Sequence, residues 1–260
     1  MRKFLQIPLS FLSSFRNCRA AKETPCITKK HFVCLANSIK YQGRCVAGVE
    51  ITFDAPGRFC IVKSEAGHPQ WIRPVSHEKY GTLPERGTQN IALFDILEIE
   101  NVVNVPKHAH SENVFYSSLK RSGKRAGQNT SHLNDLCTPV QPFLFSNKGK
   151  AISVEVFQES EHSLMFISVS NCMFYKDESD FFRDRFRVRF LYNAVEYDLP
   201  ITDPVFINRL KTKGWNPDDS KKYRYYLTVS LSEEYRGWHY KLVAGVVEVR
   251  DDGKLVQNVF

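Results

Sequence analysis

Short hydrophobic runs, rich in β-branched and aromatic residues, recur along the chain from about residue 31 onward. Gly, Pro, Asn or charged residues separate them, and this length and composition favour strands over helices. Turn signals return about every ten residues, a spacing typical of β-barrels and sandwiches. We predict strands at 31–36, 45–51, 58–62, 71–75, 91–99, with 101–106 extending that sheet, and at 151–157, 164–169, 186–190, 225–231 and 242–249.

The segment 117–134 breaks this pattern, because it has no acidic residue, few large apolar residues and two glycines. It predicts a flexible basic loop insertion that carries Lys120, Arg121, Lys124 and Arg125. Short helices are expected at 131–136 and 203–211, where Asp203 would be the N-cap and Pro204 a first-turn residue. Residues 138–150, rich in Pro, Asn, Gly and Lys, form the natural boundary between two β halves.

The fold class predicted is therefore all-β, with two consecutive small barrels at 31–140 and 141–260, short helices and the basic insertion. Residues 1–30 hold seven basic groups and one acidic group, so they contribute +6 of the formal charge of +8. We interpret them as a flexible basic leader, either loosely ordered or the product of an upstream start codon; a transit peptide is the alternative. No window of about 18 apolar residues predicts a membrane span, and seven scattered cysteines indicate reduced thiols, so we expect a cytoplasmic protein.

Motifs of the familiar enzyme classes are missing from the sequence. It has no G-x-S-x-G, no phosphate-binding loop, no dinucleotide glycine fingerprint and no H-E-x-x-H. We therefore predict no catalytic residues, no cofactor and no metal site. An enzyme with dispersed active-site residues would need groups such as Asp203, Glu233 and His239 to converge in one pocket.

One segment alternates arginine with apolar residues in the manner of a strand with two different faces. In 180–190, one face would carry the arginines and the other the apolar residues Phe182, Phe186, Val188 and Phe190. The arginines are either a track for successive phosphates or an ordinary solvated face above a Phe-lined core. The candidate phosphate contacts are Arg183, Arg185, Arg187 and Arg189.

Other polar residues form candidate contacts at the ends of predicted strands. Asn37, Lys40 and Arg44 are expected in the first inter-strand loop, and Tyr240 and Lys241 at the entry of the last strand. Arg73, close to Trp71, is either a ligand contact or the buried partner of a carboxylate such as Asp95.

Four phrases are more specific than any single motif. They are VCLANSIKYQGRCVAG (33–48), QWIRPVS (70–76), LPITDP (199–204) and YLTVSLSEEYRGWHYKLVAGVVE (226–248). In this order the chain resembles the dual OB-domain family, bacterial proteins found beside mobile-element and phage-conflict genes. The resemblance implies two OB-type barrels and a role in binding nucleic acid or nucleotides, and it supplies no catalytic residues. The longer region before Trp71 and the segment 117–134 depart from the family pattern.

The leading hypothesis is a non-catalytic module that binds nucleic acid, with single-stranded DNA or RNA favoured over a nucleotide, in a bacterial defence setting. An OB barrel binds single strands through a basic groove with aromatic stacking platforms. The alternatives are a scaffold that joins a defence complex through exposed sheet edges, and a nucleic-acid-processing enzyme with dispersed active-site residues.

Overall fold

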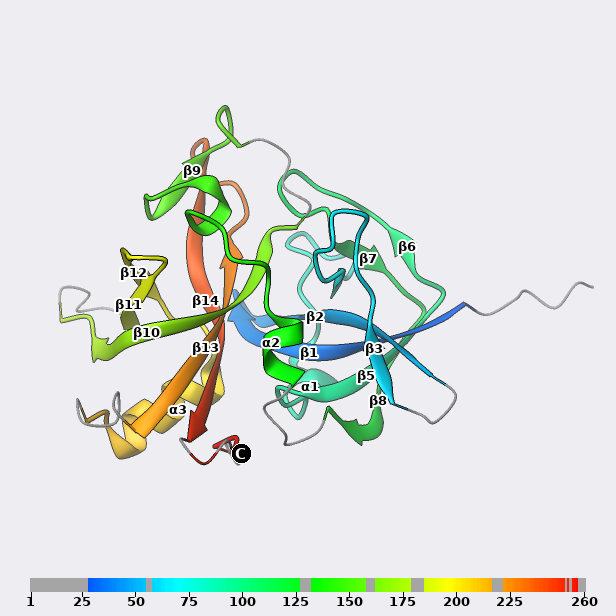
Figure 1. The fold of residues 1–260 in the computed structure, drawn as a ribbon. Coiled ribbons are helices and arrows are strands. Elements are labelled where there is room, and N and C mark those ends of the chain that lie inside the picture. The colour runs from blue at the N-terminus through cyan, green and yellow to red at the C-terminus, as the bar shows by residue number, and fades with distance from the viewer. Residues whose placement is uncertain are drawn as a thin grey trace, which may run out of the picture.

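The computed structural model describes residues 28–54, 58–126, 132–157, 162–178, 185–216, 222–250, 252 and 254–256. Their strands form one sheet of eight strands and one of six (Figure 1). The first sheet holds β1 (Lys29–Lys40), β2 (Gly43–Phe53), β3 (Phe59–Ile61), β4 (Trp71–Pro74), β5 (Asp95–Glu100), β6 (Val103–Asn104), β7 (Asn113–Phe115) and β8 (Ser118–Arg125). The second holds β9 (Ala151–Ser153), β10 (Leu164–Lys176), β11 (Phe186–Tyr192), β12 (Val195–Pro200), β13 (Tyr223–Leu231) and β14 (Trp238–Arg250).

The first sheet closes into a ring. β1 pairs antiparallel with β2 and β5, and β2 pairs with β4. β4 pairs parallel with β7, while β5 pairs antiparallel with β8. Because β7 and β8 follow one another almost directly along the chain, they act as one bent strand that joins β4 to β5.

The second sheet repeats this order. β10 pairs with β11 and β13, β11 pairs with β12, and β13 pairs with β14. A parallel bridge between Ile201 and Val243 connects the end of β12 to β14. Both rings thus run first, second, third, fifth, fourth strand, the order of the five-stranded OB barrel. The predicted all-β class with two OB-like barrels is confirmed, and we propose 31–140 and 141–260 as their limits.

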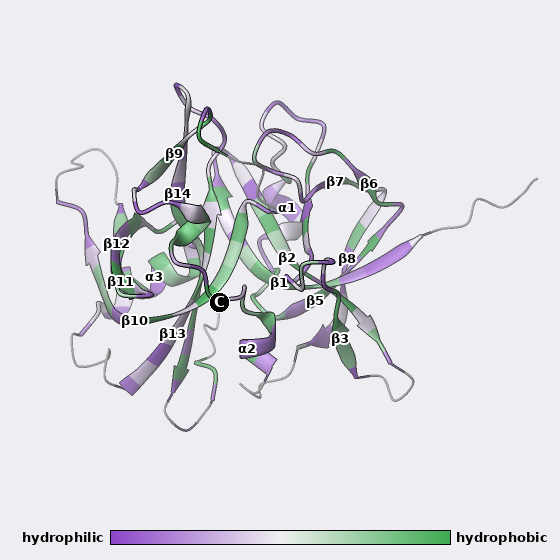
Figure 2. Ribbon diagram, turned by 45° about the horizontal axis from the view of Figure 1, so that its top comes forward, coloured by the Kyte–Doolittle hydropathy of each residue, from purple (hydrophilic) through white to green (hydrophobic). Residues whose placement is uncertain are grey.

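The two barrels share a hydrophobic core. Phe32 and Leu97 belong to the interior of the first barrel, whereas Val33 and Leu35, on the opposite face of β1, pack with Phe166 and Tyr226 of the second. β1 is therefore buried on both faces, which explains why its sequence is a continuous apolar run. Figure 2 shows hydrophobic stretches of both sheets meeting at the centre, next to α2 (Leu133–Leu136).

Gly245 permits the closest approach between the barrels. A Cβ atom at this position would collide with the carbonyl oxygen of Leu35 in β1. The neighbouring strand adds a polar contact, because the Thr228 hydroxyl donates to that same oxygen. The backbones of β1 and β14 therefore approach one another with no side chain between them.

β8 corrects the prediction of a flexible loop over 117–134 for residues 118–125, while residues 127–131 lie outside the described part of the chain. The strand pairs with β5 in a register that sets Lys120 opposite Glu98 and Arg125 opposite Asp95. Cross-strand pairs of opposite charge stabilise a sheet, and Gly123, with φ of 77°, lies where the register shifts. The strand is held by charge pairing, which hydrophobic periodicity does not reveal.

The other predicted strands and helices are present with shifted ends, since residues 91–94 and 154–157 lie outside strands. The strands β7 and β12 and a short helix at 85–88 were not predicted. Besides α2, short helices occur as α1 (Glu85–Thr88) and α3 (Pro204–Lys213). The Asp203 carboxylate accepts hydrogen bonds from the amides of Val205 and Phe206, as an N-cap does.

Residues 1–27 of the predicted leader lie outside the described residues, while Lys29 and Lys30 open β1. Within the described part of the chain, no helix is long and apolar enough to span a bilayer.

Candidate nucleic-acid interface

The first part of β14 exposes aromatic side chains on one face. Trp238 and Tyr240 are 45% and 44% exposed, whereas the alternate residues His239 and Lys241 are buried. These positions pair with β9, so that Trp238 lies opposite Ser153. Tyr235, in the loop before β14, is also exposed. We call Tyr235, Trp238 and Tyr240 the aromatic strip.

Basic side chains lie beside the aromatic strip. The Arg236 guanidinium lies 5.2 Å from the ring centroid of Tyr235. The backbone carbonyl of Lys150 accepts a hydrogen bond from the Lys241 amide, next to Tyr240. Burial acts to raise the pKa of Asp198 in β12, but the Tyr175 and Arg187 hydrogen bonds, the Arg187 charge and, last, the Lys150 charge together lower it. The backbone of Lys150 therefore lies at the Tyr240 end of the aromatic strip, while Arg236 lies at the Tyr235 end.

The alternation predicted for the arginine segment is present in β11, where Phe186, Val188 and Phe190 are buried. Arg187, however, donates from Nε to Asp198 Oδ1 over 2.8 Å, and its guanidinium is 3.9 Å from Asp177. Tyr175 donates to the other oxygen of Asp198. Arg187 is thus occupied within the protein, which favours the solvated-face interpretation at this position.

The other three arginines of the segment differ in placement. Arg189 is exposed, 3.9 Å from Glu196, with its guanidinium 5.9 Å from the Tyr175 ring centroid. Arg185 lies at the exposed start of β11, and Arg183 lies outside the described residues. Arg189 is thus exposed and stays a candidate phosphate contact.

Lys241 points inward and does not reach a ligand. Its Nζ donates to the carbonyl oxygens of Asn147 and Gly149 and lies 5.2 Å from the Tyr197 ring centroid. Burial lowers its pKa to about 7. Lys241 is therefore buried and does not fit the predicted role of a phosphate contact. Its hydrogen bonds instead hold the segment before β9.

The basic residues of β8 are largely neutralised. Lys120 pairs with Glu98 and Glu100 on β5. Arg121 and Arg125 both contact the buried carboxylate of Asp95, at 2.8 Å and 3.2 Å.

Lys124, the remaining basic residue predicted on this segment, places its Nζ 5.1 Å from the Phe53 ring centroid. Because β8 meets acidic partners on β5, it is a weaker candidate for phosphate binding than its composition indicates.

Two of the three polar residues predicted in the first loop are instead buried in strands. Asn37 donates to the carbonyls of Thr88 and Ile91, and Arg44 is 2.9 Å from Glu85. Lys40 ends β1 and does reach the hairpin.

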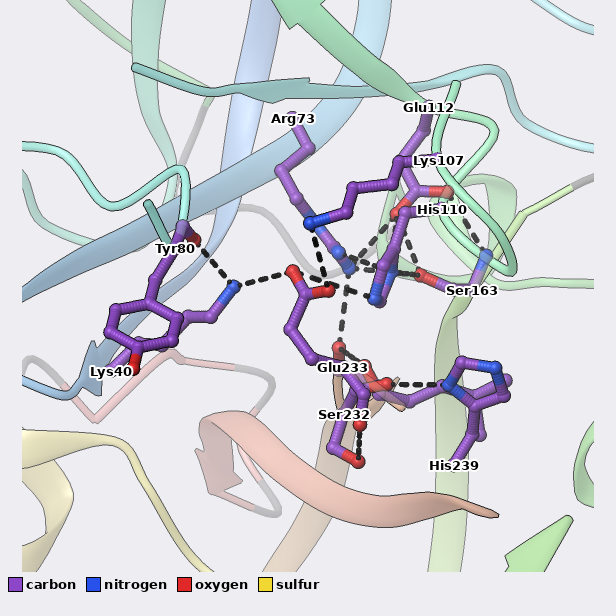
Figure 3. Close-up of polar contacts among 12 residues, drawn as sticks. Lys40, Arg73, Tyr80, Lys107, His110, Glu112, Ser163, Ser232, Glu233 and His239 are labelled. Atoms are coloured by element: carbon purple, nitrogen blue, oxygen red, sulfur yellow. Dashed lines mark hydrogen bonds and ion pairs between the residues drawn. The ribbon is translucent and has the colours of Figure 1, made fainter. Parts of the chain in front are cut away.

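Arg73 is buried among charged groups between the barrels (Figure 3). Its Nη2 lies 2.9 Å from Glu112 Oε1, so its partner is Glu112 and the expected pairing with Asp95 is wrong. The same guanidinium contacts Ser163 and Ser230 from the second barrel, at 3.0 Å and 3.2 Å. We call Arg73, His110, Glu112, Ser163 and Ser230 the interbarrel cluster.

The interbarrel cluster contains a serine, a histidine and a carboxylate, but its geometry does not suit nucleophilic catalysis. Ser163 is fully buried, and its Oγ lies 2.7 Å from Glu112 and 2.7 Å from His110 while accepting from Arg73. A nucleophile needs access to its substrate, and this oxygen has none. Of the three residues that a dispersed active site would need, Glu233 and His239 lie near the cluster. Asp203 instead caps α3.

Sequence reasoning listed Tyr240 but missed Trp238 as an exposed aromatic. The alternation Trp-His-Tyr-Lys over 238–241 was a usable signal, because a strand sets Trp238 and Tyr240 on one face. The interbarrel cluster had no such signal, since Arg73, Glu112, Ser163 and Ser230 are far apart in sequence.

Both halves of the molecule are therefore OB barrels, joined through a common core, with an aromatic strip on the second. The family model described as a dual OB-containing domain matches residues 30–246, and the chain belongs to this family. No curated protein matches the chain.

Three solved structures show distant similarity. "Crystal structure of p204 HINb domain" is 10% identical, covers 83% of this chain and 96% of its own, and has a TM-score of 0.33. "Structure and Conformational Change of a Replication Protein A Heterotrimer Bound to ssDNA" is 7% identical, covers 92% and 51%, and has a TM-score of 0.29. "Molecular basis for abrogation of activation of pro-inflammatory cytokines" is 9% identical, covers 84% and 93%, and has a TM-score of 0.26.

Proposed function

We propose that this protein is a non-catalytic module that binds single-stranded nucleic acid through the second OB barrel. The observation that carries the proposal is the aromatic strip, with Arg236 on one side and Lys150 on the other. In OB barrels, oligonucleotides bind to the face of the second and third strands and to the loops beside it. Here those strands are β11 and β12, and the loop before the last strand carries Tyr235 and Arg236.

Exposed aromatic rings favour single strands, because an unpaired base offers its π-face for stacking while a paired base is already stacked. Trp238 and Tyr240 would each receive a base, and Arg189, Arg236 and Lys150 would contact phosphates. None of these five contacts requires a particular base edge. We therefore expect little sequence specificity.

The double variant Trp238→Ala, Tyr240→Ala tests the proposal. Stacking on an aromatic side chain is worth about 1–3 kcal/mol per base, so we expect affinity for a labelled single-stranded oligonucleotide to fall at least about tenfold. Chemical denaturation of the variant shows whether the fold survives, because both rings are also about half buried. Fluorescence anisotropy at several salt concentrations measures the affinity in the full chain.

The salt dependence supplies the control. The two rings are neutral, so their removal does not change the number of counterions released on binding. The log–log salt slope of the double variant should therefore equal that of the parent. Arg236→Ala should instead flatten the slope by a little under one unit, because one phosphate contact is lost. Unchanged affinity in the double variant would exclude the aromatic strip as the binding site.

The wider setting is part of the proposal. The family resemblance supports a bacterial defence role in the cytoplasm, with a nucleotide as the second ligand. A protein scaffold is the competing function, and the exposed apolar residues Val154 and Val156 near β9 favour it. A parent protein that binds no oligonucleotide would direct attention to that surface.

A further inference from the structure

The protonation of His110 follows from its neighbours. Arg73 Nη1 lies 2.6 Å from His110 Nδ1. A guanidinium can only donate hydrogen bonds, so in the Arg73 contact Nδ1 accepts and the neutral ring carries its proton on Nε2. Ser163 Oγ, 2.7 Å from the same nitrogen, then directs its one proton to Nδ1 or to Glu112 Oε1. Burial lowers the pKa of His110, and the Arg73 charge lowers it further, which favours this neutral form.

The N–H of this histidine points at a carboxylate from the other barrel. His110 Nε2 is buried and has no hydrogen-bond partner among the described residues, and it lies 4.0 Å from Glu233 Oε1. Glu112 and Ser163 hold Arg73, and Arg73 holds the imidazole. The interbarrel cluster therefore fixes a donor that faces the space between the barrels.

Two lysines point at the same carboxylate (Figure 3). Lys40 Nζ, at the end of β1, is 2.9 Å from Glu233 Oε1, and Lys107 Nζ is 3.7 Å from Glu233 Oε2. Three donors of the first barrel thus surround one acidic group of the second. Lys40 and Glu233 are each about a quarter exposed, so the place is reached from solvent.

An aromatic pair borders this position. Tyr41 and Tyr80 stack with ring centroids 3.9 Å apart, and Lys40 Nζ also donates to the Tyr80 carbonyl. Tyr41 is 63% exposed, so its ring is available to a base. Cations beside an exposed aromatic ring suit a phosphate attached to a base.

We propose that Lys40, Lys107 and His110 form a phosphate-binding site, and that the Glu233 carboxylate occupies it when no ligand is bound. A phosphate group would displace Glu233, which lies in the loop between β13 and β14, and would accept hydrogen bonds from the same three donors. The site rests on the proposed function where the phosphate belongs to a nucleic-acid strand. It also accommodates the phosphate of a free nucleotide.

Glu233→Gln tests this site, because it removes the competing charge and keeps the shape of the side chain. We expect the variant to bind a labelled single-stranded oligonucleotide about three- to tenfold more tightly than the parent. The log–log salt slope should steepen by a little under one unit, since one more phosphate is neutralised. Adding Lys107→Gln to this variant should reverse both changes.

Glu234→Gln is the matched control. It removes the same charge from the same loop, but Glu234 accepts from the amide of Gly237 and none of the three donors is its partner in the described structure. Equal gains in affinity for the two variants would show a general charge effect and would overturn the site. Melting temperatures of both variants show whether the loop has been disturbed.

Small phosphate ligands test the phosphate site separately from the binding of single-stranded nucleic acid. Inorganic phosphate and adenosine monophosphate are added to parent, Glu233→Gln and Glu234→Gln, and the rise in melting temperature is recorded. If no protein binds an oligonucleotide but Glu233→Gln alone gains stability with phosphate, the proposed function fails and the site stands for a free nucleotide. If neither phosphate nor adenosine monophosphate raises the melting temperature of Glu233→Gln more than that of Glu234→Gln, the site is wrong.

Discussion

Two buried charged residues, Asp203 and Arg73, are each held by hydrogen bonds or ion pairs from other parts of the fold. Asp203 was predicted as an N-cap because the cap and the proline that follows are local features, and it has that role. Arg73 was predicted to be either a ligand contact or the buried partner of a carboxylate such as Asp95. Its partner is Glu112, and it also contacts Ser163, which lies 90 positions after Arg73 in the chain. Nothing local indicates such a choice, because a buried charge is compensated by whatever groups the tertiary fold brings near it.

The interbarrel cluster makes stability depend on pH. Burial lowers the pKa of His110, so near pH 6.5 and below the unfolded chain takes up a proton that the folded chain does not. Burial alone would raise the pKa of Glu112, but Arg73, His110 and Ser163 together hold it well below its usual range. Glu112 therefore stabilises the fold above about pH 4.5, and this contribution is lost as the pH falls further.

We predict that His110 lowers the unfolding free energy as pH falls from 7 to 5, and that His110→Asn removes this contribution. Asp203, whose pKa burial raises to about 6, acts in the opposite direction in both proteins, so the comparison of the two curves isolates His110. The Asn carbonyl can still accept from Arg73, but the side chain does not titrate. Chemical denaturation at several pH values measures the change in unfolding free energy with pH, and His132→Asn, at the exposed start of α2, is the control. If the unfolding free energies of parent and His110→Asn change in parallel between pH 7 and 5, the lowered pKa of His110 is contradicted.

At the scale of elements, most strands could be predicted because their hydrophobic runs are long. β8 could not, since its side chains are polar and its partners are the acidic residues of β5. β12 has the same difficulty, because Glu196 and Asp198 dilute its apolar residues. The exposed aromatic strip illustrates a further limit. Trp238 and Tyr240 are as apolar as core residues, and only the ring closure of the barrel leaves this end of β14 outside.

The contact of β14 with β1 gives a prediction at this scale. Gly245→Ala would push a methyl group into the Leu35 carbonyl, and overpacking of this kind costs about 1–3 kcal/mol. We expect a loss of that size in urea denaturation, with the transition still single because the two barrels share one core. A variant as stable as the parent would show that β1 and β14 are less closely packed than described.

At the scale of the molecule, two rings with the same strand order are joined face to face. The family resemblance predicted two barrels, and hydrophobic periodicity supported them, but neither predicted the shared core. Sharing it fixes the two barrels against one another. Lys40 and Lys107 of the first barrel can then meet Glu233 of the second at defined distances. The proposed nucleic-acid surface and the proposed phosphate site consequently lie on two barrels that share one core.

The central claim is that single strands bind at the aromatic strip, and photo-crosslinking tests it most directly. An oligonucleotide containing 5-iodouracil is bound to the full chain and irradiated, and the crosslinked residues are identified by mass spectrometry. This measurement locates contacts, so it separates the strip from the basic residues 1–30, which could attract any polyanion. The account predicts crosslinks at Trp238 or Tyr240 that are lost on competition with unlabelled single strand. Crosslinks confined to residues 1–30 or to β8 would contradict it.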